Sequence, residues 1–517
     1  MLSHTKIDNT SRTNNSIRNS TVVVLSKMIN VFFSFIVRTL IINKLGIEIL
    51  GIDGLFASVI TVLSLADLGI GTAITYSLYK PIANQDYKTC AAYMNFFQKV
   101  YVLVGSVIFV LGLLLIPFLP YLINLPNHVD NLMLIYILTL ASSAISYFLS
   151  SRRVIYEANQ VGYAITAVDT ISSLISQCLQ VLVIVLFNDY VIVLLVRIFA
   201  TILSNGYIFV ESNKDFSYIF KKRNASLKKC QMRKLRTDLM AIVCHKIGGV
   251  FVTGTDNMLI SYFIGTILTG VYSNYLLITN TVSTLIAMSI NAIIPSIGNL
   301  KESSDDKDHQ FEIFWEVQLV NYVVSSVFLV FMYCLINPFI TIWLGKKYIF
   351  DELTTALICV VFYISSMRYG VGAFSVAAGY FKKTVYKPVL ESIINLIVSL
   401  ILVGYIGIDG IILGTLVSLI LGSVWVDPYV VFKNWFKKPF SEYVRQYVSL
   451  LIFTLSLGEG LYILCKEVYI DNMFLDFGVK AIICLTSIPL LLLFIRTKRG
   501  YKTLSKHILN RRMTKIL

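Results

Sequence analysis

Charged residues are scarce in this chain of 517 residues. They make up 14% of the sequence, whereas hydrophobic residues make up 56% and the mean hydropathy is +0.75. A soluble domain averages about 25% charged and about 45–50% apolar residues. The composition therefore indicates an integral membrane protein.

Sequence motifs typical of disulfide frameworks, zinc sites and nucleotide binding are also missing. The eight cysteines are scattered without a CxxC pair, and most lie in apolar segments, which argues against a disulfide framework or a zinc site. The sequence contains no GxxxxGK[ST] motif and no glycine-rich turn in a soluble context. Its loops are too short to hold a soluble catalytic domain. We therefore expect no cofactor, no metal, no catalytic residues and no enzymatic activity.

Long apolar segments dominate what is present. A spanning helix needs about 20 mostly apolar residues, and fourteen segments meet this requirement. We predict an all-α protein with spans near 20–43, 47–79, 92–118, 131–151, 162–187, 190–211, 237–262, 267–297, 311–341, 354–379, 385–405, 409–432, 444–465 and 473–495.

The basic residues are concentrated in alternate loops. Of the 44 Lys and Arg residues, 32 lie in the segments 1–18, 80–91, 152–160, 212–236, 299–309, 380–387, 433–438 and 496–517. The positive-inside rule assigns these segments and both termini to the cytoplasm. We therefore expect a multi-pass protein of the cytoplasmic membrane. The basic linker 212–236 borders the membrane, so we expect it to attract anionic lipids at the cytoplasmic face and not nucleic acid.

The chain also repeats itself. Residues 44–74 align with residues 263–293 at an offset of 219, which matches Gly46 with Gly265 and Gly51 with Gly270. An offset of six spans keeps the orientation and predicts two parallel lobes. The predicted division is an N-lobe of helices 1–6, a basic cytoplasmic linker, a C-lobe of helices 7–12, two extra helices 13–14 and a basic cytoplasmic tail: 1–211, 212–236, 237–432, 433–495 and 496–517.

Three stretches resemble a known family: RTLIINKLGIEILGIDGLFASVITVLSLADLGIGTAITYSLYKPIA (38–83), GTDNMLISYFIGTILTGVYSNYLLI (254–278) and AAGYFKKTVYKPVLESIINLIVSLILVGYIGIDGIILGTLVS (377–418). They look like the Wzx-like polysaccharide-repeat-unit flippases, which handle O-antigen and capsule units. This family belongs to the MOP exporter superfamily, together with MATE antiporters and MurJ-like lipid II flippases.

The resemblance implies two six-helix lobes in a MATE-like V and a trailing helix pair. It also implies a cargo of undecaprenyl-diphosphate-linked oligosaccharide, a polyprenyl-diphosphate lipid that alternating access moves from the inner to the outer leaflet. Polymerase machinery for the same polysaccharide is an expected partner. The run of basic residues early in helix one of the MurJ-like branch is missing here, which makes lipid II itself a less favoured cargo.

Four cations lie within the predicted spans: Arg38, Arg197, Lys246 and Arg368. A charge near the bilayer centre costs about 2.5–3.5 kcal/mol on insertion scales, so each is a functional candidate. A pyrophosphate group crossing the membrane would need such donors. The alternative is that each cation pairs with an acid, and for Arg38 we expect a structural pair with Asp53.

Four acids within apolar segments are candidates for ion coupling: Asp67, Asp169, Asp256 and Glu391. A buried carboxylate there can bind Na⁺ or take up a proton. The alternative is that these carboxylates cap backbone groups or pair with Arg.

Two other functions stay open. An ion-coupled multidrug antiporter of the same fold would need acids, and not Lys and Arg, to dominate its cavity. A membrane-embedded polysaccharide polymerase or ligase commonly places its chemistry in a sizeable external loop, which this sequence lacks.

Overall fold

The computed structural model describes residues 9–64, 70–124, 129, 131–159, 161–220, 225–227, 229, 232, 254–303, 306–501, 503 and 505. Within these ranges, the side chains of 9–21, 72–73, 303 and 381–382 are not described. The regular elements of the described residues are all helical. Twelve helices there are long and apolar enough to cross a membrane, and they coincide with twelve of the fourteen predicted spans. The other two predicted spans, 47–79 and 237–262, fall partly outside the described residues, so the number fourteen stays a prediction.

The chain forms two compact units, Met1–Ser273 and Asn274–Leu517. The division falls inside a helix, α12 (Thr266–Asn291). The lobe boundaries expected from the internal repeat remain a prediction.

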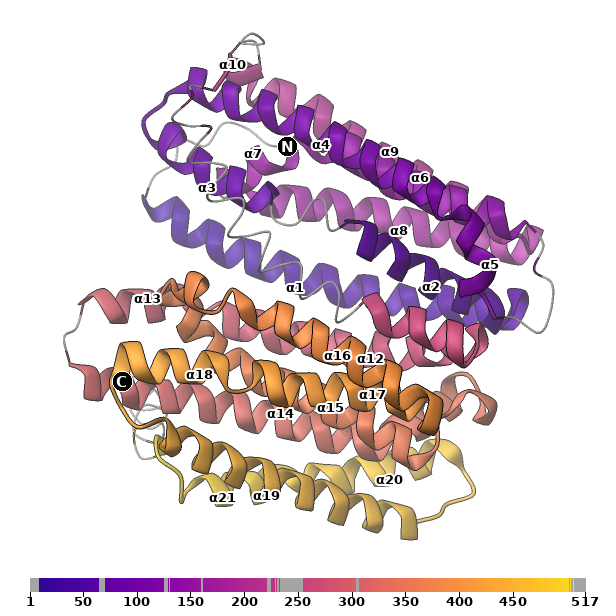
Figure 1. Cartoon of the computed structure of the whole chain (residues 1–517), viewed down its shortest axis with the longest axis vertical. Coiled ribbons are helices and arrows are strands. Elements are labelled where there is room, and N and C mark those ends of the chain that lie inside the picture. The colour runs from indigo at the N-terminus through magenta and orange to yellow at the C-terminus, as the bar shows by residue number, and fades with distance from the viewer. Residues whose placement is uncertain are drawn as a thin grey trace. The chain divides into compact units, whose positions relative to one another are not determined.

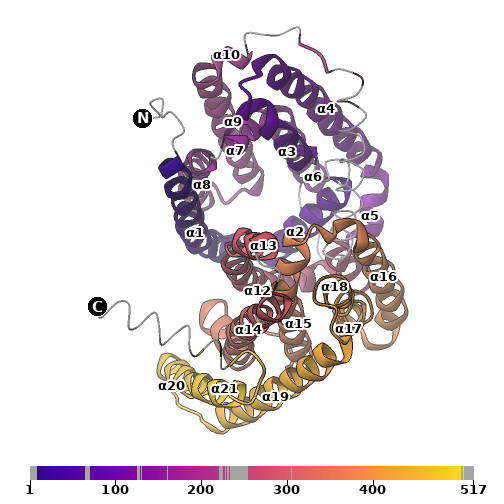
Figure 2. The same ribbon diagram turned by 90° about the vertical axis from the view of Figure 1, so that its left-hand side faces the viewer.

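The first unit is a bundle of long helices joined by short ones (Figures 1 and 2). α1 packs on α8, α8 on α9, α9 on α6, and α6 on α4 and α2. Residues 254–263 are also helical. The helices are α1 (Asn9–Leu40) with a π-helix (Ile41–Leu45), α2 (Ile47–Leu63), α3 (Ile70–Ala83), α4 (Tyr87–Leu114) with a 3₁₀-helix (Ile116–Phe118), α5 (Leu119–Leu122), α6 (Leu132–Ser150), α7 (Arg153–Ala158), α8 (Gly162–Phe187), α9 (Tyr190–Asp215) and α10 (Ser217–Phe220).

The second unit is built around α14, a helix of 37 residues that packs against α15, α19, α20 and α21. An aromatic core that includes Phe314, Trp315 and Phe432 lies at one end of α14. The helices are α13 (Ile294–Ser303), α14 (Lys307–Trp343), α15 (Glu352–Ala377), α16 (Tyr386–Ile406), α17 (Ile408–Ser418), a π-helix (Leu419–Ser423), α18 (Val426–Val431), a second π-helix (Phe432–Phe436), α19 (Phe440–Glu467), α20 (Met473–Leu485) and α21 (Ser487–Ile495), with short 3₁₀-helices at Lys346–Tyr348 and Tyr380–Lys383.

The helix starts follow from local chemistry. Asp86, Asp189 and Asp306 accept hydrogen bonds from the first backbone N–H groups of α4, α9 and α14, as acidic N-caps do. Gly46 and Gly265 precede α2 and α12 with φ angles of 95° and 137°, a region that favours glycine. The internal repeat matched these two glycines with each other, and the structure gives them the same role.

A second pair of repeat-matched glycines lies at a close helix crossing within the first unit. A Cβ atom on Gly51 of α2 would overlap the backbone oxygen of Thr266 and lie 2.9 Å from its carbonyl carbon. A Cβ atom on Gly270 of α12 would lie 2.8 Å from the backbone oxygen of Ile47 and 3.1 Å from the Gly51 nitrogen. Small residues allow membrane helices to approach in this way.

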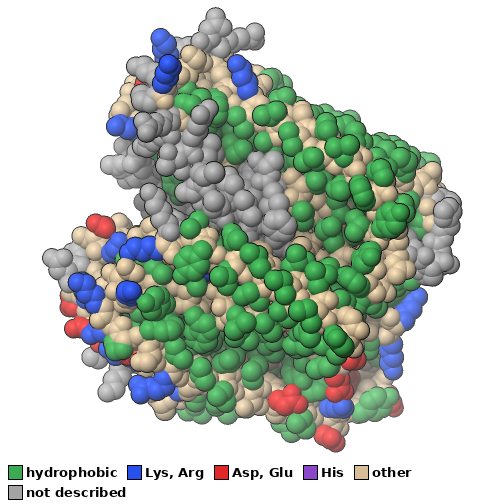
Figure 3. All heavy atoms as spheres, viewed as in Figure 1, with side chains coloured by type: hydrophobic (Ala, Val, Ile, Leu, Met, Phe, Trp, Pro, Cys, Tyr) green, Lys and Arg blue, Asp and Glu red, His purple; other side chains and the backbone are tan. Residues whose placement is uncertain are grey.

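The outer surface of the helices is apolar. Leucine, isoleucine, valine and phenylalanine side chains are exposed along them, including Leu103, Phe187, Leu421 and Leu493. In Figure 3, hydrophobic side chains cover much of the visible face, while most of the visible Lys and Arg side chains lie toward its edges. Exposed apolar area of this extent marks a surface that meets lipid. The chain is a multi-pass membrane protein.

Candidate functional site

Six of the eight candidate residues fall within the described part of the chain. Lys246 and Asp67 lie outside it. The other six are Arg38 on α1, Arg197 on α9, Asp169 on α8, Asp256 in the helical residues 254–263, Arg368 on α15 and Glu391 on α16. Asp256 is buried, with a relative exposure of 6%. The remaining five take part in polar contacts within one unit or the other.

Arg197 forms an ion pair between helices of the first unit. Its Nη1 lies 3.0 Å from Oδ1 of Asp53 on α2, and it also donates to the Tyr190 hydroxyl at 3.3 Å. Its Nε donates to Oε1 of Gln180 on α8 at 3.2 Å. This Asp53–Arg197 pair therefore connects α2, α8 and α9 through polar atoms in the membrane-spanning part of the protein.

Arg38 does not form the expected ion pair with Asp53, so that prediction is wrong. Its Nη2 donates to the Ser273 hydroxyl, and its Nε has no hydrogen-bond partner among the described residues. Arg38 and Asp53 are close in sequence, but Arg197, which is 144 residues from Asp53, binds the carboxylate.

We expect a double-mutant cycle to show that Asp53 pairs with Arg197 and not with Arg38. Asp53→Asn and Arg197→Gln remove the same contact, so their effects on the free energy of unfolding in detergent should couple by about 0.5–3 kcal/mol. The control cycle of Asp53→Asn with Arg38→Gln should show a smaller coupling energy. Coupling to Arg38 as strong as that to Arg197 would contradict the observed pairing.

Asp169 is bound by an arginine that the sequence analysis did not single out. Arg153 contacts both carboxylate oxygens, at 2.5 and 2.8 Å, and Ser204 donates to Oδ1 at 2.7 Å. Arg153 Nε donates to Oδ1 of Asn205 at 2.9 Å. These contacts match the alternative interpretation, in which the acid pairs with a cation.

A polar cavity of about 580 Å³ lies inside the first unit, beside Arg197. α6 contributes most of its hydroxyl groups, at spacings of three and four residues that place them on one face of the helix. The sequence LTLASSAISYFLSS (138–151) carries this pattern, which our sequence analysis missed. The polar and aromatic lining residues are Tyr101, Thr139, Ser142, Ser143, Ser146, Tyr147, Ser150, Arg197 and Thr201.

Arg368 is paired within the second unit. Its Nη1 lies 3.4 Å from Oε1 of Glu391 on α16, and the Ser423 hydroxyl donates to Oε2 of the same carboxylate. The Glu391 side chain is 9% exposed and the Arg368 side chain 22%. The structure thus pairs Arg368, a predicted phosphate-binding residue, with Glu391, a predicted ion-coupling residue. The sequence did not predict this pair.

A second buried pair lies one helical turn away. Lys387 of α16 donates to Asp427 of α18, and the Ser375 hydroxyl donates to Asp427 at 3.2 Å. Lys387 also interacts electrostatically with Arg368 and Glu391. We call Arg368, Lys387, Glu391 and Asp427 the four-charge cluster. Its formal charges sum to zero.

A π-helix shapes this cluster. Residues Leu419–Ser423 form it directly before α18, and Gly422 within it lies against α16: a Cβ atom there would be 3.3 Å from Cα of Glu391. Short π-helical insertions are rare and frequent at functional sites. Here the insertion places Ser423 beside Glu391.

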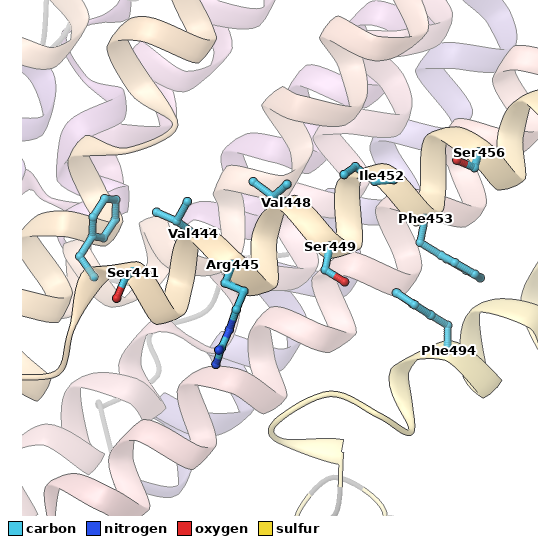
Figure 4. A pocket seen from close by; sticks show the side chains of 10 residues that line it. Ser441, Val444, Arg445, Val448, Ser449, Ile452, Phe453, Ser456 and Phe494 are labelled. Atoms are coloured by element: carbon cyan, nitrogen blue, oxygen red, sulfur yellow. The ribbon is translucent and has the colours of Figure 1, made fainter.

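An apolar groove of about 990 Å³ follows α19 (Figure 4). Val444, Val448 and Ile452 line it, and Phe453 stacks on Phe494 of α21 with ring centroids 3.7 Å apart. Figure 4 shows Phe453 and Phe494 pointing toward one another. The groove runs over residues 441–456, which is about 22 Å of helix.

Two cations lie along this α19 groove, Arg445 in its wall and Lys498 beside its middle. Arg445 lines it and is exposed, with no ion pair among the described residues. Lys498 donates to the Ser449 hydroxyl at 2.6 Å, and its Nζ lies 4.3 Å from the centre of the Phe494 ring. Partial burial lowers the pKa of Lys498 from its ordinary value. An apolar groove with cations beside it suits an amphiphile with an anionic head group.

Comparisons with known proteins identify one family and several similar folds. The sequence model of the polysaccharide biosynthesis protein family matches residues 16–301, more than half of the chain. Comparison with curated proteins gave no significant match.

Among solved structures, the fold is similar to the lipid II flippase MurJ in an inward closed conformation, with a TM-score of 0.66 and 14% identity over 93% of this chain and 99% of that one. It is also similar to an inward-facing multidrug resistance transporter of the MATE family, in the MOP superfamily, with a TM-score of 0.60 and 14% identity over 80% and 98% of the two chains. A MATE transporter of Vibrio cholerae gives a TM-score of 0.55 and 14% identity over 83% and 100%.

Proposed function

Because the chain belongs to the polysaccharide biosynthesis protein family, we propose that it is a flippase for lipid-linked oligosaccharide repeat units. In this proposal it moves undecaprenyl-diphosphate-linked units from the inner to the outer leaflet of the cytoplasmic membrane by alternating access. The units then serve surface polysaccharide synthesis, and both termini of the chain lie in the cytoplasm.

The α19 groove is the observation that carries the proposal. Its apolar wall would hold a polyprenyl chain, while Arg445 and Lys498 beside it would bind the diphosphate. Lys and Arg give charge-assisted hydrogen bonds to phosphate oxygens. The same cations would repel the cationic amphiphiles that a multidrug antiporter prefers.

The paired cations give the diphosphate further positions inside the protein. Arg197 and Arg368 already bind carboxylates, so phosphate oxygens would replace those of Asp53 and Glu391. A released Glu391 could take up a proton or Na⁺, which would couple cargo movement to an ion gradient. Arg38, Lys246, Asp67, Asp169 and Asp256 remain weaker candidates for the same two roles.

The hydroxyl-lined cavity suits the sugar part of the cargo. Serine and threonine hydroxyls can exchange hydrogen bonds with sugar hydroxyls, and Tyr101 and Tyr147 offer ring faces for stacking. The matched family and the similar folds are those of transporters and flippases, so we propose no enzymatic step. Anionic lipids at the cytoplasmic face and the polysaccharide polymerase are the proposed partners.

Deletion of the gene should abolish the surface polysaccharide and leave lipid-linked repeat units on the inner leaflet. The measurement is extraction of the lipid-linked units, combined with their accessibility to a glycosidase added outside spheroplasts. Normal polymer in a deletion strain without a second flippase gene would refute the proposed role.

Groove variants sharpen this experiment. Arg445→Gln combined with Lys498→Gln should lower polymer production about tenfold or more, because each charged hydrogen bond contributes about 1.5–3 kcal/mol. Lys466→Gln is the matched control, since Lys466 lies at the other end of α19 with its side chain 60% exposed. Equal loss in both strains would show that the groove cations have no special role.

A further inference from the structure

Three cysteines that are far apart in the sequence meet in the second unit. Cys334 of α14, Cys465 of α19 and Cys484 of α20 have their sulfur atoms within 4.8 Å of one another. All three are buried, with relative exposures of 3%, 2% and 0%. The scattered spacing of the cysteines had led us to expect no metal site, because no two of these residues share a local motif.

The spacing of the sulfur atoms suits a shared metal ion. With a metal–sulfur distance of about 2.3 Å, as for zinc, three sulfur ligands around one ion lie about 4 Å apart. A small inward movement of the three side chains would reach that distance. The chain therefore already holds three ligands from three helices near a binding geometry.

The ligand set indicates which ion would bind. Among the described residues, no histidine or carboxylate joins the three sulfur atoms. Soft thiolates select copper(I), zinc and iron–sulfur clusters, but structural zinc sites almost always have four ligands. An all-sulfur site with three ligands thus favours a soft ion of low coordination number.

A cavity gives access to the site. It has a volume of about 180 Å³, and Cys334 and Cys465 line it together with Glu352, Lys466 and Lys480. The paired side chains of Glu352 and Lys466 are 59% and 60% exposed, so this cavity reaches the surface. A buried cluster without such an entrance would be inert packing.

A basic residue also lines the cavity: Lys480, which forms an ion pair with Asp476 at 2.7 Å. Thiols bind a metal ion in their deprotonated form, so metal binding would release the thiol protons to solvent.

We propose that Cys334, Cys465 and Cys484 bind one copper(I) ion through their three sulfur atoms. The bound ion ties α19 and α20, the helices after the second π-helix, to the central helix α14. This site is independent of the proposed transport function.

Anaerobic competition with a chromogenic copper(I) chelator, bathocuproine disulfonate, tests the proposal on the full-length protein in detergent. Wild-type protein should remove one equivalent of copper(I) from the chelator, and X-ray absorption should show only sulfur neighbours. Cys334→Ser, Cys465→Ser and Cys484→Ser should each weaken binding at least tenfold. Cys359→Ser is the matched control, because Cys359 is equally buried but outside the cluster, and it should bind as wild type.

Several results would overturn the proposal. The proposal fails if wild-type protein takes up no copper(I), or if uptake is unchanged in the three cluster variants. It also fails if the protein binds zinc(II) tightly but not copper(I). A disulfide between two of the three cysteines, found by thiol counting in protein purified without reductant, would also overturn it. The X-ray absorption measurement uses wild-type protein and stays decisive if the variants do not fold.

Discussion

Gly51→Val should leave almost no folded protein in the membrane. A side chain at this position would collide with the backbone of Thr266 at the crossing of α2 and α12. Overpacking a close-packed interface costs about 1–3 kcal/mol and occasionally more. Because the obstacle is a helix backbone and not the end of a flexible side chain, we expect a cost at or above the top of this range.

Size-exclusion chromatography of a fluorescent fusion, followed by thermal melting, measures this effect. Gly206→Val is the matched control in the same unit, because a Cβ atom on Gly206 of α9 would meet nothing within 4 Å. Gly51→Ala should cause a smaller loss of folded protein than Gly51→Val. Normal accumulation and melting of Gly51→Val protein would show that α2 and α12 do not cross as described.

Lys387→Met should destabilise the protein strongly, by about 3–5 kcal/mol, because it leaves the buried Asp427 carboxylate without its counter-charge. Lys466→Met is the control: its pair with Glu352 is more than half exposed, and such pairs contribute about 1 kcal/mol or less. The measurement is the free energy of unfolding in detergent. Equal effects of the two substitutions would contradict the burial of the Lys387–Asp427 pair.

The double variant Lys387→Met with Asp427→Leu separates folding from function. Replacing both members of a buried ion pair with apolar residues is often neutral for stability, so the double variant should fold. We expect it to fail in polysaccharide export, because the four-charge cluster would have lost half of its charges. Full complementation by the folded double variant would assign the pair a purely structural role.

The fold was largely predictable from the sequence. The membrane class follows from composition, and twelve predicted spans coincide with candidate spanning helices. The family model confirms the polysaccharide biosynthesis family, and the solved structures of a lipid II flippase and a MATE transporter share the predicted fold. These features depend on residue type and spacing along one helix at a time. Both kinds of information are local in the sequence.

The charged contacts were much less predictable. Sequence gives the depth of Arg38, Arg197 or Arg368 along a helix, but not the direction in which the side chain points around it. We therefore paired Arg38 with its sequence neighbour Asp53, whereas α9 brings Arg197 to that carboxylate.

Other contacts were missed because they depend on packing between distant segments. We assigned Lys387 to a cytoplasmic loop because of the basic residues before it, and did not consider Asp427 near the end of its span. The cysteines at 334, 465 and 484 come together through the packing of three helices. No spacing rule in the sequence contains that information.

The π-helix at Leu419–Ser423 has a consequence for the history of the gene. A π turn holds one residue more than an α turn, and each residue of an α-helix turns the chain by about 100°. Removing one codon within this stretch would therefore turn the π turn into an ordinary α turn, while keeping Asp427 directed toward Lys387 and every amino acid of the four-charge cluster encoded. Related genes that are one codon shorter here would thus encode a regular α-helix in which these two charges still meet.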